Sequence, residues 1–198
     1  MNYSVPDIFQ KAIAEKPFHI KPDNSDILRI IENDISCACE WVEISIKNLH
    51  SVFCFSIDFK DKAGCDYAFP FFNADEETRI KGLRSKNDAI IICQIDQQVY
   101  VFLIELKSEN TGKYLQQLKL SKVFVNFIID IFNIVNESYE INKEDIIFKG
   151  ILFRCRKRSN KGTTRKEEKA KFDENRDKSL SIAEEPCHDT YRLQYFLP

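Results

Sequence analysis

The stretch Lys86–Ser108, KNDAIIICQIDQQVYVFLIELKS, determines how the rest of the sequence is interpreted. Its two apolar runs, Ala89–Ile95 and Val99–Ile104, flank the polar residues 96–98, which is the pattern of a β-hairpin. The turn contains neither Asn-Gly nor Asp-Gly, so its register is open by a residue or two.

Charged residues stand at one end of this predicted hairpin. A turn centred near Asp96 and Gln97 brings Asp88, at the start of the first strand, opposite Glu105, at the end of the second. Lys107 lies two residues beyond Glu105, so its side chain projects from the same face. The sequence therefore predicts two acids and one base together at the end of a sheet.

Both faces of the hairpin are apolar, which is typical of strands in the middle of a covered sheet. One face carries Ile90, Ile92, Val99, Val101 and Leu103, and the other carries Ile91, Cys93, Ile95, Tyr100, Phe102, Ile104 and Leu106. Two opposed carboxylates at the end of such a sheet repel each other, by about 3 kcal/mol at roughly 5 Å and an effective dielectric constant of ~20. A divalent cation would turn this cost into a binding site, and oxygen ligands with open positions suit Mg²⁺ or Mn²⁺.

Asp88, the hairpin and the run Glu105-Leu106-Lys107 together resemble the PD-(D/E)XK nuclease superfamily, which has the restriction-endonuclease-like fold. Asn87 stands where the family name has a proline, at a position that varies widely in the superfamily. The resemblance covers about Ser25–Phe153 and includes a long helix with a glutamine after the hairpin. It implies an α/β (α+β) domain in which helices flank a central mixed β-sheet.

The resemblance also implies a role for each site residue. Asp88 and Glu105, with the carbonyl of Leu106, would hold one or two Mg²⁺ or Mn²⁺ ions that lower the pKa of a bound water. Lys107 would orient the attacking water and offset charge that develops on the phosphate. Gln117 would position Lys107 or the water, and because it lies on an otherwise buried helix stripe it needs a polar partner.

The expected function is therefore metal-dependent hydrolysis of phosphodiester bonds, with DNA favoured over RNA, as in restriction, repair or anti-phage defence. Many superfamily members act as dimers, so a homodimer is compatible with the resemblance, although no residue in the sequence marks an interface. Two alternatives remain. The chain is either a member that has lost activity and binds nucleic acid or a protein partner, or an interaction protein that acts through its C-terminal part.

Basic residues precede the proposed active strand. Lys81, Arg84 and Lys86 end a polar segment that begins at Asn73. We expect them to contact phosphates of the nucleic acid backbone, and the alternative is a solvated loop.

A second basic segment lies near the C-terminus. Residues 154–166 hold seven Lys or Arg and no acid, and residues 157–178 contain no periodic apolar set. We expect a mobile loop within the domain whose Arg156 and Arg158 add salt-dependent affinity for nucleic acid. The alternative is an insertion that only increases solubility.

The N-terminal part is expected to be helical. Residues 1–23 form a lead that includes a short helix over Pro6–Glu15, and an N-cap signal followed by an apolar run predicts an amphipathic helix over 24–37. In the resembled superfamily a first helix often directs a glutamate to the metal, so Glu32 and Glu40 are candidates. Solvated surface carboxylates are the alternative for both.

Three further strands are expected before the hairpin. Trp41–Lys47 and Ser51–Phe59 alternate in hydropathy and are joined by a turn, and Gly64–Phe72 is typical of an edge strand because it contains a proline. Asp66 in this last segment is an alternative to Asp88 as the metal ligand, but its spacing to Glu105 is long for a hairpin partner.

After the hairpin we expect a helix over Lys113–Val135, a strand over Asp145–Cys155 and a returning edge strand over Tyr191–Leu197. Beyond Val123 the helix is apolar almost all round, so we expect it to pack inside the fold.

The length, net charge and cysteine content of the sequence limit the number of domains, the cellular compartment and the state of the cysteines. The 198 residues fit one domain, and a formal net charge of −2 argues neither for nor against nucleic acid. The sequence has neither a signal peptide nor a membrane-spanning run, which predicts a cytoplasmic protein. We expect its seven cysteines to be reduced and mostly buried. Cys37-Ala-Cys39 lacks the spacing of a zinc knuckle, and Cys155 and Cys187 are far apart in the sequence.

Overall fold

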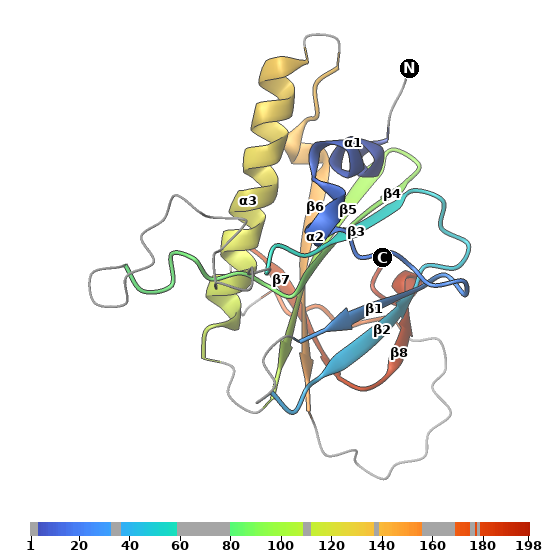
Figure 1. Cartoon of the computed structure of the whole chain (residues 1–198), viewed down its shortest axis with the longest axis vertical. Coiled ribbons are helices and arrows are strands. Elements are labelled where there is room, and N and C mark those ends of the chain that lie inside the picture. Colours follow the sequence, from blue (N-terminus) through green and yellow to red (C-terminus); the bar gives the residue numbers. More distant parts are fainter. Residues whose placement is uncertain are drawn as a thin grey trace.

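The computed structural model describes residues 4–32, 37–58, 80–108, 112–136, 139–155, 169–174, 177 and 179–198. The described residues form a mixed α+β fold with two β-sheets, which confirms the predicted fold class (Figure 1). The helices are α1 (Val5–Ala12), α2 (Glu15–Phe18) and α3 (Tyr114–Val135), with short 3-10 turns at Lys143–Asp145 and Leu193–Tyr195. The strands are β1 (Ile27–Ile31), β2 (Trp41–Ser45), β3 (Val52–Phe55), β4 (Ala89–Ile95), β5 (Gln98–Lys107), β6 (Ile146–Arg154), β7 (Ser181–Pro186) and β8 (Thr190–Arg192).

The larger sheet has five strands in the order β3-β4-β5-β6-β7. Strands β3, β4 and β5 pair antiparallel, and β5, β6 and β7 pair parallel. The predicted hairpin is confirmed as β4–β5, with Ala89 paired to Ile104 and Ile95 paired to Gln98. Asp96 takes a left-handed backbone conformation in the two-residue turn, at φ 53°, which an aspartate tolerates better than most residues.

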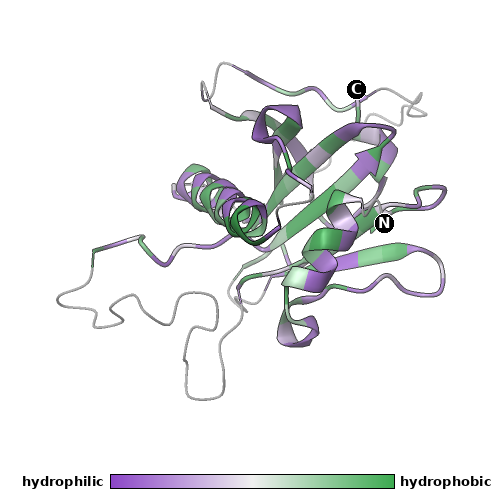
Figure 2. Cartoon of the chain, turned by 90° about the horizontal axis from the view of Figure 1, so that it is seen from above, coloured by the Kyte–Doolittle hydropathy of each residue, from purple (hydrophilic) through white to green (hydrophobic). Residues whose placement is uncertain are grey.

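The two apolar faces of the hairpin belong to two separate cores, with the side chains divided between them as the alternation predicts. Helices α1 and α3 cover the face of Ile90, Ile92 and Leu103. The second sheet, of order β1-β2-β8, lies against the opposite face with Ile91 and Phe102 (Figure 1). Figure 2 shows the apolar residues concentrated along the strands beside α3. The hairpin is therefore covered on both sides.

The predicted helix over 24–37 is wrong, because its first part forms strand β1. Leu28 and Ile30 are buried and Arg29 is exposed between them, so the burial follows the two-residue period of a strand. Asp23 Oδ1 accepts the backbone N–H groups of Ser25 and Ile27, which makes a turn where the sequence suggests a helix cap. A short apolar run rich in isoleucine does not distinguish a strand from a buried helix.

Other connections also differ from the expectation. Strands β2 and β3 are consecutive, as predicted, but belong to different sheets. Strand β7 has no predicted counterpart. The C-terminal segment gives only the short edge strand β8 before it turns at Leu193–Tyr195. The predicted strand over Gly64–Phe72 lies outside the described residues.

The predicted position of helix α3 in the sequence is confirmed, but the rest of the fold does not enclose the helix as predicted. Leu118, Val125 and Ile129 are buried against the sheet. A second apolar stripe on α3 is exposed to solvent, which corrects the expectation that the helix packs inside the fold. This stripe comprises Val123, Phe127, Ile131, Ile134 and Val135. The sequence shows that the helix is apolar all round, but it does not show which sides the rest of the chain covers.

Gly150 lies in the middle of β6, where side chains of α3 and β7 meet, so a substitution at this position tests how these elements pack. A Cβ at this position would lie 3.0 Å from Leu118 Cδ1 and 3.1 Å from Ile182 Cγ1. We expect Gly150→Val to lower the free energy of unfolding by about 1–3 kcal/mol, because these side chains must shift. Urea unfolding measures the loss. The control Ile147→Val, at an exposed position of the same strand, should change stability by under about 0.5 kcal/mol. Equal stability of both variants would contradict the packing described here.

Candidate functional site

Asp88 lies at the entrance to β4, and its carboxylate is held by the neighbouring strand. Its backbone N–H donates to Ile104 O at 3.0 Å, and Leu106 N–H donates to Asp88 Oδ2 at 2.6 Å. Asp88 is 7 % exposed, so water reaches little of it. The hydrogen bond from Leu106 fixes the direction of the carboxylate and leaves Oδ1 for another partner.

Glu105 and Lys107 lie on β5 at the same end of the sheet and form an ion pair through Glu105 Oε1 and Lys107 Nζ. Glu105 is fully buried, whereas the Lys107 side chain is 22 % exposed. Among the described residues, Glu105 Oε2 has no hydrogen-bond partner. The structure therefore brings together the three residues predicted from the hairpin, and it leaves a buried carboxylate oxygen without a donor.

The two carboxyl groups are difficult to ionise together. Burial raises the pKa of Asp88 well above its ordinary value, and the charges of Glu105 and Glu32 raise it further, against the hydrogen bond from Leu106. Burial raises the pKa of Glu105 to about 8, although Lys107 opposes the shift.

The neighbouring carboxylates favour the charged form of Lys107. Burial lowers the pKa of Lys107, but the attraction of Glu105 and then of Asp88 outweighs it and leaves the pKa above its ordinary value. The fraction of Glu105 that is ionised and paired with Lys107 therefore increases as the pH rises through about 8.

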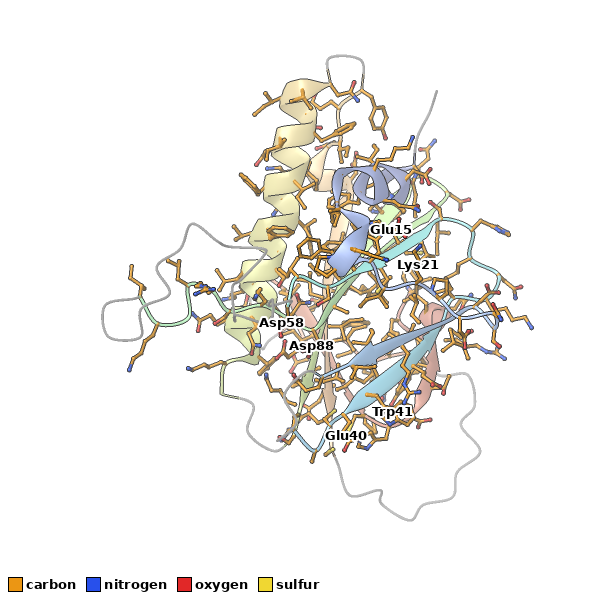
Figure 3. The ribbon with its side chains drawn as sticks, in the orientation of Figure 1. Glu15, Lys21, Glu40, Trp41, Asp58 and Asp88 are labelled. Atoms are coloured by element: carbon orange, nitrogen blue, oxygen red, sulfur yellow. The ribbon has the colours of Figure 1, made fainter. Side chains whose placement is uncertain are left out.

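Two further carboxylates belong to this neighbourhood. Glu32 follows β1, and its charge raises the pKa values of Asp88 and Glu105. It is one of the two glutamates that the sequence singled out, although it follows a strand and not a helix. The other, Glu40, donates its backbone N–H to His188 Nε2 and lies beside Trp41, apart from Asp88 (Figure 3).

Asp58, which follows β3, was not predicted as part of the site. Its charge raises the pKa of Glu105, and its Oδ1 lies 3.5 Å from Lys86 Nζ. The only sequence signal for it is an aspartate at the end of a predicted strand.

The donor set fits a hard divalent cation. Asp88 and Glu105 supply carboxylate oxygens, and no donor from the described part of the chain reaches the buried Glu105 Oε2. Among the described residues, no trio of acidic or histidine side chains brings its ligand atoms within 4.8 Å of one another. Mg²⁺ is usually bound by one or two carboxylates while it keeps several waters, so two carboxylates are enough.

Helix α3 fixes the backbone that leads into Asp88. Gln117 Nε2 donates to Lys86 O at 2.7 Å, which supplies the polar partner expected for this partly buried glutamine. One turn further along, Ser121 Oγ donates to Asn87 Oδ1 at 2.5 Å. Gln117 therefore supports the approach to Asp88 through the backbone of Lys86.

The expected nucleic-acid contacts divide into three groups. Lys81 is exposed and Arg84 is half-buried, on a turn that includes Gly82 at φ 85°. A Cβ on Gly82 would lie 2.3 Å from Gln116 Nε2, so this turn packs closely on α3. Lys86 differs from the expectation, because it is only 6 % exposed and pairs with Asp58. Arg156, Arg158 and Asp66 lie outside the described residues.

Part of the predicted mobile loop over 157–178 is held in place. Ala170 N–H donates to Tyr195 O at 2.8 Å, and Asp173 pairs with Ile182 of β7. Lys149 lies over the ring of Phe172, with Nζ 4.1 Å from the ring centre. The described residues 169–174 therefore pack on the sheet, and residues 156–168 lie outside the described part.

Comparison of the chain with protein-family models, with curated proteins and with solved structures finds no match. The resemblance to the PD-(D/E)XK superfamily thus depends on the Asp88, Glu105 and Lys107 arrangement and its hairpin. Among the described residues, no helix combines the length and the hydropathy needed to cross a membrane.

The raised pKa of Glu105 predicts that stability depends on pH and on a cation. Between the ordinary pKa of 4.5 and the folded value of about 8, the folded chain binds more protons than the unfolded chain. Its free energy of unfolding therefore falls as the pH rises through this range. We expect Tm to be lower at pH 9 than at pH 6, and Mg²⁺ to restore part of the difference at pH 9. Melting curves by circular dichroism measure it.

Glu105→Gln separates this effect from general pH sensitivity. We expect it to raise Tm at pH 9 without metal by several degrees, since each pKa unit of the shift is about 1.4 kcal/mol and 1 kcal/mol is worth about 2–4 °C. The exposed control Glu144→Gln should keep the wild-type profile. A wild-type Tm that does not change between pH 6 and pH 9 would contradict the burial of an ionisable Glu105.

Proposed function

We propose that the protein is a metal-dependent nuclease that hydrolyses phosphodiester bonds, with DNA favoured over RNA as the substrate. One observation carries the proposal. A fully buried glutamate, with an oxygen that has no donor among the described residues, lies close enough to a second buried carboxyl group to raise its pKa and is paired with a partly exposed lysine, all at the end of one hairpin.

The arrangement is costly as a purely structural feature. Burial raises the pKa of both carboxyl groups, the charge of Glu105 raises that of Asp88 further, and a single lysine balances only one negative charge. Hydrophobic side chains of similar size would fill the sheet end without this cost. A site that recruits a cation explains why two acids are placed there, because the cation offsets their repulsion and the missing hydrogen bonds.

The residues of the chain have separate tasks in this reaction. When bound, a divalent cation stabilises negative charge on the phosphate and lowers the pKa of water. Asp88, oriented by Leu106 N–H, and Glu105, through its free Oε2, are the side chains that would hold the cation. Lys107 is partly exposed and pairs with Glu105, so its ammonium group lies beside the proposed cation. There it orients the attacking water and offsets charge on the phosphate.

Nucleic acid is the substrate class that fits these tasks. Two acids that hold a hard cation and a lysine that stabilises an oxyanion suit in-line displacement at phosphorus. Exposed Lys81 and half-buried Arg84 lie on the turn that leads to Asp88, where they can contact the flanking phosphates. A homodimer would supply two such sites for the two strands of a duplex.

A binding module without activity is the second candidate. The observation that favours it is the direct ion pair of Glu105 with Lys107, which satisfies part of the carboxylate without any cation. Such a module would bind nucleic acid or a protein partner through the same end of the sheet, and cleavage assays separate the two candidates.

Cleavage is tested on supercoiled plasmid, single-stranded DNA and RNA, with Mg²⁺, Mn²⁺ or EDTA. We expect metal-dependent cutting that Lys107→Ala reduces by about 10²–10³-fold, because the lysine stabilises charge in the transition state. Binding of the uncut DNA in EDTA should remain close to wild type. The control Lys143→Ala, which breaks the surface ion pair with Asp130, should cut normally. Turnover by Lys107→Ala at the wild-type rate would remove Lys107 from the mechanism, and binding without cutting would favour the inactive module.

Metal binding is tested by calorimetry with Mg²⁺ on the full chain. Asp88→Asn should abolish the heat of binding, because an amide cannot replace the charge of the carboxylate. Asp66→Asn should bind as the wild type does if Asp88 is the ligand, and the reverse result would move the site to Asp66. The exposed Asp130→Asn serves as the control for loss of one surface charge.

A further inference from the structure

Three cysteines that are far apart in the sequence meet at one point of the fold. Cys39 precedes β2, Cys155 follows β6 and Cys187 follows β7. Their sulfur atoms all lie within 4.8 Å of one another, and the Cys155 and Cys187 sulfurs are 3.0 Å apart. No disulfide forms between them. We propose that Cys39, Cys155 and Cys187 bind one zinc ion that joins the two sheets.

The spacing of the sulfurs fits a single tetrahedral ion. A Zn–S bond of about 2.3 Å places thiolates on the same ion about 3.8 Å apart, so small rotations of the three side chains are enough. In a [4Fe–4S] cluster each thiolate binds a different iron, which requires a wider spacing. Soft thiolates select zinc over Mg²⁺, so this site is chemically distinct from the carboxylates of Asp88 and Glu105.

The surroundings of Cys39 and Cys155 favour the protonated thiol in the absence of a metal. Burial raises the pKa of Cys39, and the neighbouring Cys187 raises it further. Burial and Cys187 likewise raise the pKa of Cys155 to about 12. As thiols they point at backbone carbonyls, with Cys155 Sγ 2.9 Å from Ala38 O and Cys39 Sγ 3.5 Å from Phe153 O. Binding of zinc releases these protons to solvent and binds the sulfurs as thiolates.

His188 is placed to support one of the thiolates. Its Nε2 accepts the backbone N–H of Glu40 at 3.1 Å, so in the neutral ring the proton is on Nδ1. Nδ1 lies 3.7 Å from Cys187 Sγ, toward which it can donate. A donor to a metal-bound sulfur tunes the site from outside the ligand set. Cys37 Sγ lies 3.7 Å from Cys39 O, which makes Cys37 the candidate for the fourth position.

The bound ion would hold together the ends of strands near the acidic site. Cys155 N–H donates to Lys107 O at 3.4 Å, and Cys187 N–H donates to Arg154 O at 3.0 Å. Cys39 belongs to the segment that leads into the second sheet. Zinc would therefore fix the end of β5 that carries Lys107, in addition to joining the sheets. Its binding free energy adds to the stability of the fold.

The experiment measures metal content and cobalt spectra of the full chain, purified under reducing conditions without chelator. We expect about one zinc per chain. Metal-free protein given Co²⁺ should show sulfur-to-cobalt charge-transfer bands and the intense visible absorption of tetrahedral cobalt. Alkylation of the thiols should abolish both signals. These measurements do not depend on nuclease activity, so failure of that proposal leaves them unaffected.

Variants locate the ion. Cys155→Ser and Cys187→Ser should weaken zinc binding by more than the roughly 10–100-fold that loss of an outer hydrogen-bond partner costs. The controls Cys54→Ala and Cys93→Ala change buried cysteines of the sheet outside this cluster and should keep full zinc content. If the serine variants fail to fold, the wild-type cobalt spectrum decides alone. Absence of zinc and of the cobalt bands, a Cys155–Cys187 disulfide, or iron with sulfide in place of zinc would overturn the proposal.

Discussion

Two carboxyl groups, those of Asp88 and Glu105, are buried together at the end of an apolar hairpin, and much of the surrounding structure compensates for them. Leu106 N–H holds one oxygen of Asp88, and Lys107 pairs with Glu105. Helix α3 holds the backbone just before Asp88 through Gln117 and Ser121. Because the hairpin is covered on both faces, little solvent reaches these acids, so their charges must be balanced by the protein or by a cation.

The hairpin and its two faces were predictable because their signal is local and repeated. Alternation over two adjacent strands fixes which side chains share a face, and the short turn fixes the register to within one or two residues. Strand β1 was not predictable in the same way. Its short apolar run, Ile27–Ile31, is compatible with a helix or a strand, and the pairing with β2 decides between them. The exposed stripe of α3 was missed because its apolar sequence does not reveal which sides remain uncovered.

The candidate site was predictable only where its residues belong to the hairpin. Asp88, Glu105 and Lys107 follow from strand register. Asp58 follows β3, and its approach depends on the pairing of β3 with β4, whereas Glu32 follows β1 and approaches through the packing of the two sheets. The meeting of Cys39, Cys155 and Cys187 is likewise a tertiary event, since their spacing in the sequence matches no metal-binding motif. The position of Gln117 on a mostly buried helix stripe predicts that its side chain has a polar partner. It does not identify Lys86 O as that partner.

The double-sided apolar character of the hairpin also matters before the fold is complete. Residues 89–95 and 99–104 contain no charge, and such β-prone segments associate edge to edge when they are exposed. The nearest charges are those that flank the segments, namely Asp88 before the first, Asp96 in the turn and Glu105 after the second. Charges in these positions act as gatekeepers against aggregation. The acids that would hold a cation in the folded protein therefore also place charge beside the segments that are most prone to associate before α1, α3 and the second sheet cover the hairpin.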